Sequence, residues 1–163
     1  TVAVGMIFIG WAIGGILAGG LSDYLKKRKG IMFISPVVSL VTLLPVLYIH
    51  TMPATGLYVC LFLYGLFNTG LVISYAISGE INPPNVSGVS IAFCNMLSIL
   101  GGTLALPLIG EILDLYWDGA MVNMVPVYST QAYLTAVNIL PISLVIALIF
   151  AVGVKETHCQ AKQ

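Results

Sequence analysis

The sequence predicts an all-α integral membrane protein that crosses the bilayer five times. Of its 163 residues, 59% are hydrophobic and 7% are charged, whereas a soluble domain carries about 25% charged residues. No Asp, Glu, Lys or Arg occurs in the stretches 30–79, 81–110 and 119–154, and about 20 apolar residues suffice for a helix to cross a bilayer. These runs lack the apolar–polar alternation of barrel strands, so we expect helices.

Five apolar runs meet the required length one after another. We expect helices at 2–21, 31–48, 57–78, 88–113 and 133–154. The first four are followed by GGLSDYLKKRKG, HTMPATG, GEINPPN and a polar, aromatic loop at 114–132, and the last by a polar tail at 155–163. Four prolines fall inside these runs: Pro36, Pro45, Pro107 and Pro141. In a membrane, neighbouring groups can take over the freed hydrogen bonds, so these prolines predict kinks rather than helix ends.

The distribution of basic residues predicts the orientation. Four of them lie in the first turn, Lys26, Lys27, Arg28 and Lys29, and the other two, Lys155 and Lys162, lie in the tail. With five crossings all six fall on one side, which the positive-inside rule makes cytoplasmic. We therefore expect the C-terminus inside and Thr1 outside. The outer side then receives Asp114, Asp118 and the aromatic residues Tyr116, Trp117 and Tyr133.

Several classes of protein are disfavoured by composition. The net charge is zero, which predicts no nucleic-acid partner. The cysteines Cys60, Cys94 and Cys159 form no CxxC pair, so neither a zinc site nor a disulfide is expected. We find no nucleophile–base pair, metal cluster or phosphate loop, and therefore expect neither an enzyme nor a cofactor. The chain begins at Thr1 without a methionine and is expected to be a piece of a longer protein.

Glycines at a spacing of four residues occur twice in the first run. Gly10 pairs with Gly14, and Gly15 pairs with Gly19. Small residues at this spacing let two helix backbones approach closely. We expect them to serve helix packing, and a moving interface would need them as well.

Short motifs, taken in order, give the chain a family resemblance. The first turn resembles the major facilitator superfamily signature G-x-L-[AS]-D-x-x-G-[RK]-[RK], with Lys26 in place of the second glycine. The matching residues are Gly19, Leu21, Ser22, Asp23, Lys27 and Arg28. GEINPPNVSG resembles the acid-x-x-Pro turn of the family through Glu80 and Pro83, with Ser87 where an arginine is usual. LGGTLALPLIGEILD resembles the eleventh helix, and VKET resembles the end of the twelfth.

This resemblance implies helices eight to twelve of a twelve-helix secondary transporter. More narrowly, the stretch from Glu80 to Gly119 is similar to the phagosomal nutrient transporters of intracellular bacteria, although Leu106 departs from an expected glutamine. That subgroup implies a symporter for amino acids in the bacterial inner membrane. The implied partners are a small-molecule substrate, membrane lipid and the remaining helices of the full-length transporter.

The resemblance also implies a substrate cavity near the bilayer midplane, bounded by the first, third and fourth helices. Polar residues on those helices are the candidate substrate ligands: Trp11, Tyr64, Asn68, Tyr75, Asn95 and Ser98. Tyr64, Asn68 and Tyr75 share one face of a continuous helix because they are four and seven residues apart. The alternative is hydrogen bonding between helices without any ligand.

Charges at the cytoplasmic ends suggest a latch made of Asp23, Lys27, Arg28 and Glu80. We expect Glu80 to pair with Arg28 or Lys27, and Asp23 to cap a neighbouring helix N-terminus, where an anion is favoured. Such a latch would hold one access state and open in the other. The alternative is that these charges only fix the orientation.

Two functions therefore remain open. The first is alternating-access transport of a small polar nutrient such as an amino acid. The second is a non-transporting membrane protein, either a truncated fragment or an assembly partner, because five helices alone cannot alternate access around a central site. The sequence upstream of Thr1 would distinguish the two.

Overall fold

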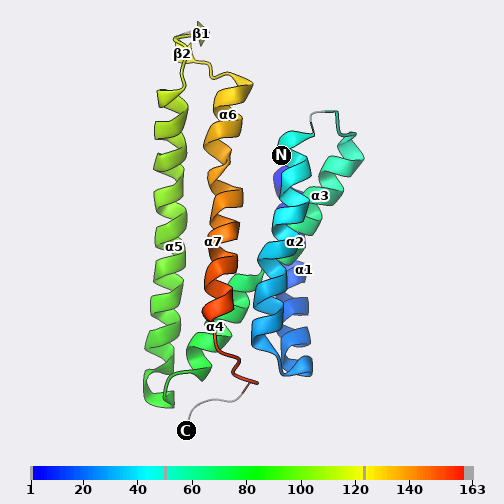
Figure 1. Ribbon diagram of the computed structural model, residues 1–163, viewed down its shortest axis with the longest axis vertical. Coiled ribbons are helices and arrows are strands. Elements are labelled where there is room, and N and C mark those ends of the chain that lie inside the picture. The colour runs from blue at the N-terminus through cyan, green and yellow to red at the C-terminus, as the bar shows by residue number, and fades with distance from the viewer. Residues whose placement is uncertain (1, 50, 123, 160–163) are drawn as a thin grey trace.

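The computed structural model describes residues 2–49, 51–122 and 124–159 and consists of long helices and one small hairpin (Figure 1). The elements in chain order are α1 (Val2–Leu25), α2 (Arg28–Tyr48), α3 (Ala54–Phe67), α4 (Gly70–Glu80), α5 (Pro84–Leu115), β1 (Met121–Val122), β2 (Val125–Pro126), α6 (Thr130–Val137) and α7 (Ile139–Gly153). The two short strands pair antiparallel within the loop predicted at 114–132.

Five helical spans in the described part of the chain are long and apolar enough to cross a membrane. They are Val2–Leu25, Arg28–Tyr48, Ala54–Glu80, Pro84–Leu115 and Thr130–Gly153, so that α3 with α4, and α6 with α7, each form one span. The protein is thus a multi-span helical membrane protein, as the composition predicts. The spans run past the predicted limits, because helix α1 continues through Asp23 and α5 begins at Pro84, a residue suited to the first position of a helix.

The third predicted helix, 57–78, is not continuous. It ends at Phe67 and a new helix begins at Gly70, with the backbone of Asn68 at φ −75°, ψ 42°. The hydroxyl of Ser35 donates to the carbonyl of Phe67, and that of Thr69 donates to the carbonyl of Leu66 at 3.3 Å. These side chains give partners to carbonyls that the break removes from the helical ladder.

The prediction that prolines do not end the helices is confirmed for three residues. Pro36 and Pro45 lie inside α2, and Pro107 lies inside α5. Pro141 is different, because it lies in the first turn of α7, directly after a second break at Asn138. A proline is tolerated there since the first backbone N–H groups of a helix have no intrahelical acceptor.

Helix α4 lies between α5 and the helices α1 and α2 (Figure 1). Helices α1 and α2 pack against α3, α7 packs against α2, and α5 packs against α4 and α6. The α1–α2 turn, the α4–α5 turn and residues 154–159 lie at one end of the molecule, and the β-hairpin lies at the other (Figure 1). We call the first of these the basic end, because it carries Lys26–Lys29 and Lys155.

Glycines bring α1 and α3 into backbone contact. A Cβ atom at Gly10 would lie 2.2 Å from the carbonyl oxygen of Phe62, one at Gly14 would lie 2.0 Å from that of Leu66, and one at Gly65 would lie 2.1 Å from that of Ile7. The first predicted glycine pair, Gly10 and Gly14, therefore serves close helix packing, together with Gly65 on the facing helix.

The second glycine pair packs differently. A Cβ atom at Gly15 would lie 3.8 Å from Val72 Cγ2, which is ordinary contact, and one at Gly19 would meet no described atom within 4 Å. Helices α1 and α3 run in the same direction, since Gly10 faces Phe62 and Gly14, one turn later, faces Leu66.

Gly10→Ala and Gly14→Ala should each destabilise the protein, because the added methyl group meets a backbone carbonyl that cannot turn aside. Overpacking typically costs about 1–3 kcal/mol. The matched control is Gly20→Ala in the same helix, where a Cβ meets nothing within 4 Å and helix propensity improves by about 1 kcal/mol. Thermal unfolding in detergent should rank the control at or above the native protein. Equal melting temperatures for all three variants would contradict this packing.

Candidate functional site

Four of the predicted cavity residues form two hydrogen-bonded pairs. The amide Nδ2 of Asn68 donates to the phenol oxygen of Tyr64 at 3.3 Å, within the third span. The hydroxyl of Tyr75 donates to Oδ1 of Asn95 at 2.8 Å and so joins α4 to α5. The expectation of one continuous face through Tyr64, Asn68 and Tyr75 is wrong, because the break after Phe67 places Tyr75 on a separate helix.

Asn68 stands out by its position. It caps the C-terminus of α3, its side chain is exposed, and it follows Phe67, the midpoint of the 27-residue span Ala54–Glu80. A polar amide in the centre of a bilayer is costly unless it faces protein or a water-filled cavity. This residue therefore identifies the side of the third span that needs a polar environment.

The last two candidates, Trp11 and Ser98, are placed differently. Trp11 is exposed on α1, and because Gly10 packs against Phe62 and Gly14 against Leu66, Trp11 lies closer to the level of Tyr64 than to that of Asn68. The hydroxyl of Ser98 donates to the carbonyl of Cys94 in its own helix at 2.9 Å. Ser98 therefore makes its hydrogen bond within α5 and joins neither of the two pairs.

A second polar site occupies the basic end, and Arg28 is its centre. The guanidinium Nη1 lies 2.6 Å from Asp23 Oδ1, and Nη2 lies 2.7 Å from Glu80 Oε1. The Arg28 side chain is 9% exposed and that of Glu80 is 14% exposed, whereas Asp23 is open to solvent. The expected contact between Glu80 and the first turn is thus made by Arg28.

Two hydroxyl groups complete this Arg28 cluster, which we define as Ser22, Asp23, Arg28, Glu80, Glu156 and Thr157. Ser22 is fully buried and accepts a hydrogen bond from Arg28 Nη1 at 3.0 Å. Thr157 donates to the second carboxylate oxygen of Glu80. Arg28 and Glu80 are therefore hydrogen-bonded on several sides, as a buried ion pair requires.

Glu156 caps the N-terminus of α2. Its Oε1 accepts from the backbone N–H of Arg28 at 2.7 Å, and its Oε2 accepts from that of Lys29 at 3.0 Å. The prediction that Asp23 would cap a neighbouring helix is wrong, since Asp23 pairs with the Arg28 side chain instead. An acid in the tail was a weak signal for this cap, because the tail was already expected on the same side as the first turn.

The electrostatics of Glu156 reflect this cap. Burial raises the pKa of its carboxyl group, but hydrogen bonds from the backbone of Arg28, His158, Lys29 and Thr157 together lower it by more. The net result is a pKa below the ordinary value of 4.5. Hydrogen bonds to the ionised form stabilise that form. The charged carboxylate is therefore the state that holds the tail on α2.

The two lysines before Arg28 have different surroundings. Lys26 adopts a left-handed backbone conformation with φ 50°, which a glycine adopts at little cost. Lys27 is exposed and occupies the N-cap position of α2. In the described part of the chain both ion pairs are made by Arg28. Lys27, which was also expected in the latch, makes no ion pair with a described residue.

No protein-family model, curated protein or solved structure matches this chain. Among the described residues, no group of three or more His, Cys, Asp or Glu side chains is placed to hold a metal ion.

Removing the charge of Glu156 should release the tail. Its lowered pKa means that the cap contributes stability above pH 4.5 and loses it as the pH falls through the lower native pKa. In Glu156→Gln we expect faster alkylation of Cys159, whose thiol lies 3.6 Å from the Ser22 carbonyl, and faster hydrogen exchange at Arg28 and Lys29. Lys155→Gln, a change at the exposed neighbouring residue, is the control. Identical rates of alkylation and exchange in both variants would show that Glu156 does not cap α2.

Proposed function

We propose that the chain is the C-terminal part, helices eight to twelve, of a major facilitator transporter. It would move a small polar nutrient, such as an amino acid, by alternating access between two halves. The observation that carries the proposal is the interruption of the third span at mid-depth, beside the exposed amide of Asn68. Irregular backbone at membrane depth is tolerated where it is buried in protein or lines a cavity, and transporters use such breaks at their substrate sites.

The first turn adds support to the family assignment. The motif that this turn resembles has a glycine where this chain has Lys26, and Lys26 has a positive φ of 50°. A position that requires a left-handed backbone explains why glycine would be usual there. Arg28 and Asp23, which match the motif, contact one another in the same turn.

In this proposal the substrate lies between Asn68 with Tyr64 on the third span and Asn95 with Tyr75 at the α4–α5 contact. Amides and phenol groups orient a polar ligand by hydrogen bonds, and Trp11 on α1 would cover it. Ser98 is a weaker member of this set, because its hydroxyl bonds its own helix. The basic end would face the bacterial cytoplasm, with Val2 at the start of α1 on the outer side.

The Arg28 cluster would then act as the cytoplasmic latch. It joins α1, α2, α4 and the tail through Asp23, Arg28, Glu80 and Thr157. The contacts span helices that must separate if the cytoplasmic side is to open, so they favour the closed state.

Substrate uptake is the first test. The complete protein in proteoliposomes should accumulate at least one amino acid, and a proton gradient should drive the accumulation if the transporter is a proton symporter. Asn68→Ala should raise KM about tenfold, the effect of losing one hydrogen bond of roughly 1.4 kcal/mol. Thr135→Ala is the control, since Thr135 is partly exposed on α6 and bonds its own helix. No uptake in either condition would favour the non-transporting alternative.

Alkylation of a native cysteine tests the latch. Cys94 lies one turn before Ser98 on α5 and is partly exposed. In Glu80→Gln and Asp23→Asn we expect faster alkylation of Cys94 by a maleimide added on the cytoplasmic side, because the weakened latch populates the open state. Lys155→Gln should leave the rate unchanged. Unchanged rates of Cys94 alkylation in both latch variants would mean that these charges only fix the orientation of the protein in the membrane.

A further inference from the structure

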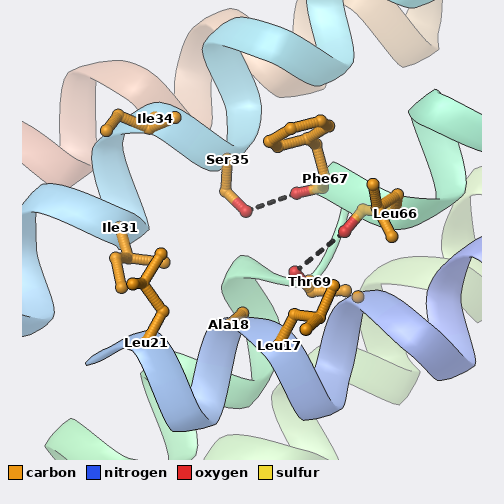
Figure 2. Close-up of a pocket in the computed structure, with 10 residues that line it drawn as sticks. Leu17, Ala18, Leu21, Ile31, Ile34, Ser35, Leu66, Phe67 and Thr69 are labelled. Atoms are coloured by element: carbon orange, nitrogen blue, oxygen red, sulfur yellow. Dashed lines mark hydrogen bonds between the residues drawn. The ribbon is translucent and has the colours of Figure 1, made fainter. Parts of the chain in front are cut away.

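A groove between α1 and α2 opens next to the charged turn that joins them. The two helices pack on α3 rather than along one another, and the space left between them has a volume of about 260 Å³. It is lined by Gly14, Leu17, Ala18 and Leu21 of α1, by Ile31, Ile34 and Ser35 of α2, and by Leu66, Phe67 and Thr69 at the break (Figure 2).

The lining is suited to an alkyl chain. Its hydroxyl groups are already used, since Ser35 donates to the carbonyl of Phe67 and Thr69 donates to that of Leu66 (Figure 2). The other lining residues are aliphatic, aromatic or glycine. A polar ligand would lose hydration in this groove and find few groups to replace it.

The groove is open along its side. Leu17, Leu21 and Ile34 are 57%, 51% and 52% exposed, so a flexible chain can enter from the bilayer. From Gly14 to Leu21 the groove follows α1 for about 10 Å, at 1.5 Å per residue. The space therefore accommodates one extended hydrocarbon chain.

Two free cations stand at the basic end of the groove. Leu21 and Ile31 line the groove at its end nearest the turn, and the turn between them presents the exposed residues Lys26 and Lys27. Arg28 is engaged by Asp23 and Glu80, and Lys29 Nζ donates to the carbonyl of Val152 at 2.7 Å. Among the described residues of the turn, Lys26 and Lys27 are thus the cations left to meet an anion.

We propose that this groove binds one acyl chain of an anionic phospholipid whose phosphate lies against Lys26 and Lys27. The apolar lining holds the hydrocarbon, and the two lysines select the headgroup. Basic sites between membrane helices recognise anionic lipids in this way, at a gain of about fivefold in affinity for each lysine. The proposal depends only on insertion in a bilayer, so it stands or falls separately from transport.

Photo-crosslinking in lipid nanodiscs tests the site. The complete protein is incubated with phosphatidylglycerol or phosphatidylcholine, each carrying a diazirine on the acyl chain, and adducts are mapped by mass spectrometry. We expect adducts on residues 17–21 and 31–34, roughly 25-fold more abundant with phosphatidylglycerol if each lysine contributes about fivefold. The double variant Lys26→Gln/Lys27→Gln should abolish that excess, and Lys155→Gln should retain it.

A second variant tests the groove itself. Ala18→Phe should fill the space beside Leu17 and remove the adducts, whereas Ala12→Phe, an exposed position of α1 outside the groove, should leave them. Equal labelling by the two lipids would mean bulk contact only and would overturn the proposal. So would the absence of adducts in the groove when other lipid-facing residues are labelled, because a segment of the longer protein would then cover it.

Discussion

One buried guanidinium holds the basic end of this protein together. Arg28 begins α2, yet its side chain pairs with Asp23 at the end of α1 and with Glu80 at the end of α4, and Glu80 in turn holds Thr157 in the tail. A charge this buried is stable only when its partners are in place. The positions of three helix ends and of the tail are therefore coupled, since none can move without leaving a buried charge incompletely paired.

Buried polar groups near the centre of the molecule also need hydrogen-bond partners. The interruption after Phe67 frees backbone carbonyls near the middle of the third span, and hydroxyl groups of Ser35 and Thr69 supply their partners. Close contact of α1 with α3 at Gly10, Gly14 and Gly65 fixes the first part of the third span, so that Asn68 is presented from a rigid base. An irregular segment is thereby held at one depth by regular neighbours.

Much of this architecture could be predicted because a bilayer makes demands that composition reveals. Charge-free runs gave the five spans, and opposite charges at the same end gave the contact of Arg28 with Glu80. The break at Asn68 could not be predicted, because an apolar run reports burial and not the backbone angles of a single residue. The cap by Glu156 was missed because it joins residues 128 positions apart, and the only signal for it was that the tail and the first turn were expected on the same side. The two pairs around Asn68 and Asn95 required knowledge of the break.

The Glu156 cap also sets an order of events during synthesis. The amides of Arg28 and Lys29 emerge early, but their acceptor is made 128 and 127 residues later. At about 5–20 residues per second, translation reaches Glu156 roughly 6–25 s after Arg28. During that interval the start of α2 has no permanent acceptor from its own chain, and its amides are open to water or to a chaperone. The N-terminus of α2 can therefore be capped only after α7 and the start of the tail have been synthesised.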